Sequence, residues 1–289
     1  MARTETGPGL DFRGRTGAGS DAPLCRRAGQ RVRLYPGPGT APLVLMVHGS
    51  GWHGQQFHAL ASRVAAAGLA EVIVPDLRGH GADPERRGDV DYIGQLEDDL
   101  AALIDARGQG RRIVMVGHSS GGGLVVRFAG GRQGGRLDAA VLLAPYLGHR
   151  APSSRPGSGG WARVRTGRII ALTLLNALGI TALNHLPVIG FRFPAEILDG
   201  PLGQTVTTEY SFRLNTSYAP RRDWQGDLAR LPRWRLLAGA EDEAMIADRY
   251  SETLQAVPAP GEVVILDGVG HLDLPDRDEV FAALRELLK

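Results

Sequence analysis

Two adjacent serines stand between glycines in "VMVGHSSGGG" (114–123), directly after a run of β-forming residues. A serine becomes an exposed nucleophile when it occupies the sharp turn from a strand into a helix, with the pattern G-x-S-x-G. Strand and helix close tightly around such a turn, so the positions two before and two after the serine must be small. Ser119 has Gly117 and Gly121 there, whereas the second serine would place His118 in the turn. Ser119 is therefore the predicted nucleophile.

A serine hydroxyl needs a base, and the base needs an acid that orients it. With this type of turn the three residues follow along the chain in the order serine, acid, histidine. After Ser119, "LLAGAEDEAM" leaves a predicted strand with an acidic cluster, and "LDGVGHLDL" leaves the next strand with a histidine. We predict Asp242 as the acid and His271 as the base. Glu241 and Glu243 are the alternative acids.

Negative charge on a substrate oxygen is stabilised by backbone N–H groups aimed at it. One such group is expected from Ser120, the residue after the predicted nucleophile. The second is expected from the turn "HGSGWHG", which follows the apolar run "PLVLMV". Ser50 is the predicted donor in that turn, and Gly51 is the alternative. Gly51, Trp52 and His118 are also predicted to line a substrate pocket.

Short apolar runs that end in glycine or a turn supply the frame for these residues. The central runs are almost continuous in Val, Ile, Leu and Met, which is typical of parallel strands covered on both faces. The runs span residues 31–37, 42–49, 70–79, 111–119, 138–145, 233–242 and 261–271. Helical periodicity alternates with them at residues 55–68, 93–108 and 277–289. Alternating strands and helices predict a doubly wound α/β fold.

The alternation stops between residues 146 and 222. A Gly/Ser/Pro-rich connector (148–160) precedes a stretch that is apolar nearly all round (167–191). We predict that 146–222 forms a mostly helical cap, inserted between the two parts of the core at 23–145 and 223–289. An apolar helix must be buried or face an apolar partner. The cap residues predicted to line an acyl tunnel or meet a lipid surface include Leu172, Leu175, Leu178 and Leu183.

Composition excludes several other classes of protein. The 289 residues are 43% hydrophobic and carry a formal net charge of +2, enough for a large core but without a basic stripe for nucleic acid. Cys25 is the single cysteine, so neither a disulfide framework nor a thiolate metal site is expected. His48, His53 and His58 lack metal-ligand spacing. No metal and no cofactor are predicted.

The first 22 residues are polar and Gly-rich, unlike a secretory signal. They are predicted to form a flexible leader, with a short edge strand near residues 10–13. No stretch offers the ~18 uninterrupted apolar residues of a membrane span. We expect a cytoplasmic protein without stable membrane insertion, whose cap could still contact a lipid interface. The oligomeric state is unknown from sequence.

Five segments stand in a familiar order between residues 42 and 289, outside the cap: "HGSGWHG", "PDLRGHG", "GHSSGGG", "GAEDE" and "GVGH". Together they resemble the α/β-hydrolase superfamily, nearest its monoglyceride-lipase/lysophospholipase-like branch. The resemblance implies a mostly parallel eight-stranded sheet flanked by helices. It also implies metal-independent acyl transfer through an acyl-serine.

These observations predict a serine hydrolase that cleaves small-molecule esters with an apolar acyl or alcohol part. An aminopeptidase-type enzyme would use the same triad and need cap acids such as Glu196, Asp199 or Glu209 to hold a substrate amine. A C–C bond hydrolase or perhydrolase would differ only in its pocket. A non-catalytic binding homologue would normally have lost a member of the triad, and all three are present in the sequence.

Overall fold

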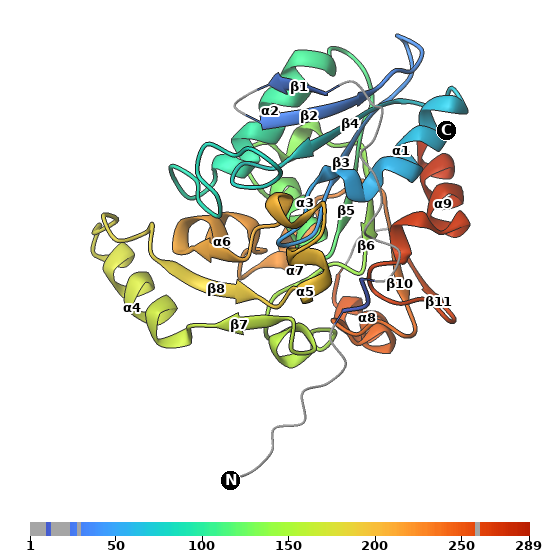
Figure 1. The fold of residues 1–289 in the computed structure, drawn as a ribbon. Helices are drawn as coiled ribbons and strands as arrows, with labels where there is room; N and C mark the ends of the chain where they lie inside the picture. Colours follow the sequence, from blue (N-terminus) through green and yellow to red (C-terminus); the bar gives the residue numbers. More distant parts are fainter. Residues whose placement is uncertain (1–9, 13–23, 28–29, 258–260) are drawn as a thin grey trace.

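The structure is a computed structural model that describes residues 10–12, 24–27, 30–257 and 261–289. At its centre lies an eight-stranded sheet in the order β1-β2-β4-β3-β5-β6-β10-β11 (Figure 1). β2 pairs antiparallel with β1 and β4, and every other neighbouring pair is parallel, so the predicted fold class is confirmed. The strands are β1 (Leu24–Arg27), β2 (Gln30–Tyr35), β3 (Leu43–Val47), β4 (Glu71–Asp76), β5 (Ile113–His118), β6 (Ala139–Leu143), β10 (Trp234–Gly239) and β11 (Gly261–Leu266).

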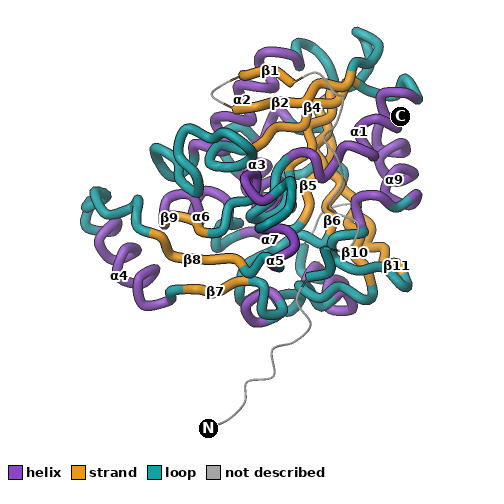
Figure 2. The backbone as a smooth tube through the Cα atoms, viewed as in Figure 1, coloured by secondary structure: helices purple, strands orange, loops and turns teal. Residues whose placement is uncertain are grey.

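Helices cover both faces of this sheet (Figures 1 and 2). The step from β3 to β4 runs across the sheet in one direction, and the steps from β4 through β5 and β6 to β11 run in the other. Because parallel crossovers are right-handed, this reversal places α1 on one face and α2 and α3 on the opposite face. The C-terminal α9 packs beside α1. The core helices are α1 (His58–Ala66), α2 (Gln95–Arg107), α3 (Ser120–Gly130), α7 (Trp224–Leu228), α8 (Tyr250–Leu254) and α9 (Asp278–Leu288).

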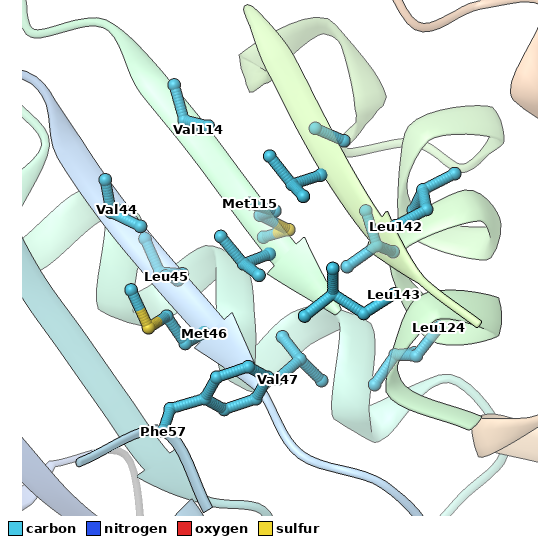
Figure 3. Close-up of a cluster of buried hydrophobic side chains, with 14 of the residues drawn as sticks. Val44, Leu45, Met46, Val47, Phe57, Val114, Met115, Leu124, Leu142 and Leu143 are labelled. Atoms are coloured by element: carbon cyan, nitrogen blue, oxygen red, sulfur yellow. The ribbon is translucent and has the colours of Figure 1, made fainter. Parts of the chain in front are cut away.

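The four inner strands β3, β4, β5 and β6 are buried along their whole length. Their side chains alternate between the two faces, as the labelled residues of β3 do in Figure 3, where Phe57 packs against them. Burying one such side chain stabilises a fold by roughly 1.5–3 kcal/mol. This core gives the strand ends a rigid support. Short 3-10 helices join the elements: η1 (Gly54–Phe57), η2 (Gly134–Arg136), η3 (Pro156–Ser158), η4 (Gly203–Thr205), η5 (Ala247–Arg249) and η6 (Leu274–Asp276).

The segment between β6 and α7, predicted as a mostly helical cap, contains helices and also a small antiparallel sheet in the order β7-β8-β9. Its elements are β7 (Ala162–Val164), α4 (Thr166–Ala177), β8 (Pro187–Phe191), α5 (Ala195–Leu198), β9 (Glu209–Ser211) and α6 (Phe212–Tyr218). The apolar stretch 167–191 is thus a helix followed by a strand. The side-chain amides of Asn176 and Asn184 exchange hydrogen bonds of 2.6 and 2.8 Å and close the turn between them.

The N-terminal segment differs from its prediction where it is described. Residues 10–12 form no strand, and Arg13 lies outside the described residues, as does most of the leader. Phe12 is buried and belongs to an aromatic cluster with residues of the cap and of the core. This part of the chain is therefore packed against the body of the protein. No helix in the described part of the chain has the length and apolar character needed to cross a membrane.

Candidate active site

Ser119 stands alone between the last residue of β5 and the first residue of α3, with φ 55° and ψ −122°. A non-glycine residue in this region is strained by about 1–3 kcal/mol, so the surrounding structure must impose it. A Cβ atom on Gly117 would lie 2.5 Å from the Gly121 carbonyl oxygen, and one on Gly121 would lie 2.3 Å from the Val47 oxygen. Only glycine fits at both positions, which is the reason the sequence pattern could identify this turn.

Ser119 and His271 line the same pocket, while Ser120 is not among the lining residues. This distinguishes the two serines of the motif. His271 follows β11 and Asp242 follows the neighbouring parallel strand β10, so both residues leave the sheet at its carboxyl edge. That edge is where α/β sheets bind ligands. The structure therefore brings the predicted base to the predicted nucleophile's pocket.

Asp242 is the acid that contacts His271. Its Oδ2 lies 2.7 Å from His271 Nδ1, and both residues are 2% exposed. The other oxygen, Oδ1, accepts hydrogen bonds from the amides of Ala244 (2.8 Å) and Met245 (2.6 Å). These bonds fix the carboxylate while leaving Oδ2 directed at the ring. Of the three acids in the cluster, Asp242 is the one paired with the imidazole.

Glu243, one of the alternative acids, contacts the backbone of the histidine instead of its ring. Its Oε2 accepts the His271 amide hydrogen at 2.8 Å, and its Oε1 accepts the Asp11 amide hydrogen at 3.3 Å. The remaining acid, Glu241, is exposed. The sequence motif gave no signal for this role of Glu243.

The electrostatic surroundings raise the pKa of His271 above its ordinary value. Burial alone lowers the pKa, because it disfavours the charged ring. The negative charge and hydrogen bond of Asp242 oppose this, with a further contribution from Glu243, and together they outweigh burial. Nδ1 donates to Asp242, which leaves Nε2 to accept a proton. The imidazole is thus arranged to hold a proton transiently.

The backbone amides of the turn after β3 differ in whether they have a hydrogen-bond acceptor. Gly49 donates its N–H to the side chain of Gln56 (3.0 Å), and Gly51 donates to the hydroxyl of Tyr210 (2.6 Å). In the described residues no acceptor is found for the amides of Ser50 and Ser120. Those two N–H groups are free to bind an oxygen of a ligand. The contact with Tyr210 favours Ser50 over Gly51 as the second donor.

A chain of buried hydrogen bonds joins this turn to the histidine loop. Gln56 accepts from Gly49 with its carbonyl oxygen, so its amide nitrogen donates to His118 Nδ1, at 2.7 Å. His118 Nε2 then donates to the carbonyl oxygen of His271, at 3.0 Å. The rings of His118 and His271 are also in contact, with centroids 4.5 Å apart. Sequence reasoning missed Gln56, because its role depends on contacts to residues distant in sequence.

The cap holds the same turn from the opposite side. Tyr210 on β9 accepts the Gly51 amide hydrogen and donates its own hydrogen to His80 Nε2, at 2.6 Å. Thr207 donates its amide hydrogen to the Gly51 carbonyl at 2.8 Å. Burial lowers the pKa of His80 to about 3, so its ring stays neutral and can accept. Both backbone groups of Gly51 are therefore fixed by the cap.

The pocket at this site is narrow and partly open to solvent. One end is polar and holds Gly49, Ser50, Gln56, His118, Ser119 and His271. The other end is apolar and is lined by Leu10, Phe12, Trp52, Trp161, Phe193 and Leu272. Trp52 and His118 line the pocket as predicted. Gly51 is not among the lining residues, because its backbone is turned to the cap.

The structure does not bring the four cap leucines to this pocket. Leu172 is buried in a separate cluster with Val188 and Phe212, and Leu175 packs at its edge. Leu178 and Leu183 are exposed, by 76% and 43%. Helix α4 lies at the periphery, where only Leu172 of its residues is buried. The apolar wall near Ser119 is supplied instead by aromatic residues from other segments.

The segment "DLRGHG" and the neighbouring histidines support the site. Asp76 accepts from Arg33 at 2.5 Å and from the amide of Gly54 at 2.8 Å, and Arg78 forms a two-bond pair with Asp99. These contacts join the segment to β2 and to α2. Burial lowers the pKa of His48 and of His53 to about 4. No cluster of metal-ligating side chains occurs within the residues that the structure describes.

An α/β-hydrolase architecture is defined by the sheet, by the reversal of its strand order at β3 and β4, and by the strained serine between β5 and α3. A family model described as "Alpha/beta hydrolase family" matches residues 44–284, and the chain belongs to this family. The resemblance noted from its motifs is confirmed.

Known proteins similar to the chain include lipases. Lipase LipV of Mycobacterium tuberculosis is 38% identical over 116 residues, which are 40% of this chain and 41% of the relative. A monoacylglycerol lipase of Mycolicibacterium smegmatis is 35% identical over 116 residues, 38% of this chain and 40% of the relative. Among solved structures, monoacylglycerol lipase of Paleococcus ferrophilus superposes with a TM-score of 0.66 at 18% identity, covering 90% of this chain and 98% of the other.

Proposed function

We propose that the protein is a serine hydrolase that cleaves carboxylic esters with an apolar acyl or alcohol part. The observation that carries the proposal is the meeting of three groups in one pocket with an aromatic wall. These are Ser119 in its strained turn, His271 paired with Asp242, and the unpaired amide of Ser50. The lipase relatives are consistent with this substrate class.

In the first half of the reaction, Ser119 Oγ attacks the ester carbonyl carbon while His271 Nε2 takes the hydroxyl proton. The negative oxygen of the tetrahedral intermediate accepts hydrogen bonds from the amides of Ser50 and Ser120. Removing one such donor costs about 3 kcal/mol in comparable sites. The C–O bond to the leaving alcohol then breaks, and His271 returns the proton to that alcohol. The acyl group remains on Ser119.

In the second half, water replaces the alcohol. His271 takes a proton from the water molecule as its oxygen attacks the acyl carbon, and the same two amides hold the oxyanion. The bond to Ser119 breaks, the proton returns to Oγ, and the carboxylic acid leaves. Asp242 keeps the ring in one tautomer throughout and stabilises the imidazolium that forms in each half.

The pocket favours an ester over a peptide substrate with a free amino terminus. No carboxylate is among the lining residues that the structure describes, whereas a bound ammonium group would require one. Of the cap acids considered for that role, Glu209 is paired with Arg165, and Glu196 and Asp199 do not line the pocket. The apolar end instead offers aromatic rings and leucine side chains.

We extend the proposal to the exposed apolar side of the cap, which we infer meets a lipid interface. Ile170, Leu174 and Leu178 lie along α4 and its end, and each is more than half exposed. Exposed apolar patches of this kind mark interaction surfaces in soluble proteins. Such a surface would bring the pocket to esters held in micelles or membranes.

The proposed function is tested by labelling with a fluorophosphonate, which reacts with an activated serine, together with turnover of p-nitrophenyl esters. Wild type is expected to be labelled and to hydrolyse esters, with more activity on medium acyl chains than on acetate. Ser119→Ala is expected to lose both, and Ser120→Ala, which keeps its backbone amide, to stay within about tenfold of wild type. Labelling of Ser119→Ala would reject the assignment. Faster turnover of aminoacyl-naphthylamides than of every ester would favour the peptidase alternative.

A further inference from the structure

The apolar end of the pocket includes a residue from the N-terminal segment. Phe12 lies among three aromatic side chains, with ring centroids 5.7 Å from Trp52, 5.5 Å from Trp161 and 5.5 Å from Phe193. Trp52 follows the turn that carries Ser50, and the other two rings belong to the cap. Phe12 is only 8% exposed, and it lines the pocket together with Leu10. One ring therefore fills the space between core and cap.

A backbone contact seats this segment beside the reacting groups. The Asp11 amide donates to Glu243 Oε1 at 3.3 Å, and the other oxygen of the same carboxylate accepts the His271 amide hydrogen at 2.8 Å. Glu243 is thus shared between the N-terminal segment and the loop of the predicted base. The contact holds the backbone next to Phe12 beside the histidine loop.

We propose that residues 10–12 form a wall of the substrate pocket and that Phe12 sets the size of the apolar group that the enzyme accepts. This inference rests on the proposed function of the same site. The Phe12 ring closes the apolar end, because the aromatic rings around it are in contact with one another. The ring centroids of Trp161 and Phe193 lie 4.7 Å apart, and those of Trp52 and Phe193 lie 6.0 Å apart. A shorter side chain at position 12 leaves a space continuous with the pocket, and a larger one reduces it.

Because Phe12 touches only the unreactive part of the substrate in this arrangement, its replacement changes selectivity more than it changes the chemical step. One methylene gained or lost in an apolar pocket changes kcat/KM by roughly 10- to 200-fold. Esters in which both the acyl and the alcohol part are short do not reach the Phe12 ring, and their turnover is expected to be insensitive to its replacement. The contribution of Phe12 is therefore a dependence on chain length.

The test uses the full chain with Phe12→Ala and Phe12→Trp. kcat/KM is measured with p-nitrophenyl esters from acetate to decanoate and with n-alkyl acetates of increasing alcohol length, so that either part of the substrate can occupy the pocket. Phe12→Ala is expected to raise the ratio of kcat/KM for the longest ester to kcat/KM for the shortest ester at least about tenfold in one of the two series. Phe12→Trp is expected to lower the same ratio.

Phe281→Ala is the matched control, because it removes a partly buried phenylalanine ring on α9 that lies outside the pocket. It should leave both chain-length profiles as in wild type. An unchanged profile in both Phe12 variants, or the same fold-change for every ester, would overturn the proposal. Should Phe12→Ala fail to fold by circular dichroism, the opposite shift expected from Phe12→Trp still decides it.

A second readout separates this inference from the proposed function. Labelling rates of Ser119 with fluorophosphonates of short and long alkyl chains report the pocket size without requiring ester turnover. If no ester is hydrolysed but Phe12→Ala still speeds labelling by the long reagent relative to the short one, the proposed function fails and the pocket wall stands. If esters are hydrolysed and neither readout shifts, only the pocket wall fails.

Discussion

The polar end of the pocket lies at the ends of β3, β5 and β11, whereas its apolar end is assembled from Phe12, Trp52 and two rings of the cap. The polar groups are placed by buried strands and by bonds to backbone amides, as for Asp242. The aromatic groups are held by ring contacts between segments far apart in the chain. The two ends line one pocket but are stabilised by different forces.

This difference separates the chemistry from the selectivity. A group in the polar end that moves by 1 Å loses its hydrogen-bond geometry, and such a misplacement can cost about 100-fold in rate. A ring in the apolar end can be exchanged for another apolar side chain at a cost of a few kcal/mol at most. Substitutions at the two ends should therefore differ in the size and in the kind of their effect.

The largest effect is expected from Asp242→Asn. An asparagine amide can donate to His271 Nδ1 and so favour the wrong tautomer, which lowers kcat by about 10⁴-fold in a comparable triad. The measurement is kcat for a p-nitrophenyl ester under saturating conditions. Glu241→Gln, in the exposed neighbouring acid, serves as the control and should remain within a few-fold of wild type. A larger loss in Glu241→Gln than in Asp242→Asn would move the acid to Glu241.

A smaller effect is expected from Tyr210→Phe, which tests whether the cap also supports the polar end. The variant keeps the ring but leaves the Gly51 amide without its acceptor and His80 without its donor. The turn that carries Ser50 is then held less firmly by the cap. We therefore expect kcat to fall on the order of 10- to 100-fold with little change in KM. Tyr35→Phe, whose hydroxyl contacts His58 outside the pocket, is the control. A change confined to KM would contradict this role.

A still smaller effect is expected at the exposed face of the cap. Leu174→Ser with Leu178→Ser removes apolar surface that the pocket does not use. We expect a several-fold loss of activity on emulsified esters and no loss on dissolved short-chain esters, because only the former present an interface. Equal losses on both substrates would show that the two leucines do not act through an interface.

The smallest effect is expected in the pH profile. His271 must be neutral to accept a proton, so kcat/KM should rise with pH through the pKa of His271 in the free enzyme. That pKa is raised, which places the acid limb above the ordinary histidine value of about 6.5. Glu243→Gln removes one of the charges that raise it, so the limb should move to lower pH. A limb that moves to higher pH, or does not move, would contradict the electrostatic role of Glu243.

The sequence predicted the polar end of the pocket well because its constraints are local. Gly117 and Gly121 can be read from the chain, since any Cβ at either position meets backbone atoms. The strands that carry Asp242 and His271 are apolar runs ending in turns, and their order matches the fold. The sheet and the pairing of the acid with the histidine therefore agree with what the sequence predicts.

The apolar end could not be predicted in the same way. Phe12 lies in a stretch with the composition of a leader, and only tertiary contacts show that it is buried. The sequence predicts a helix where β8 lies, because a short apolar run does not distinguish a strand from a buried helix. The prediction that the four cap leucines line the pocket rests on hydrophobicity alone, which gives no direction in space; only Leu172 and Leu175 lie on α4.

The order of the strands has a consequence for the newly made chain. Ser119 and its turn follow β5, whereas β10, β11, Asp242 and His271 are all made later, after the whole of the cap. A nascent chain can therefore form the bend with its hydroxyl long before a partner exists to withdraw the proton. In the proposed mechanism the serine therefore stays inert until β10 and β11 have been made.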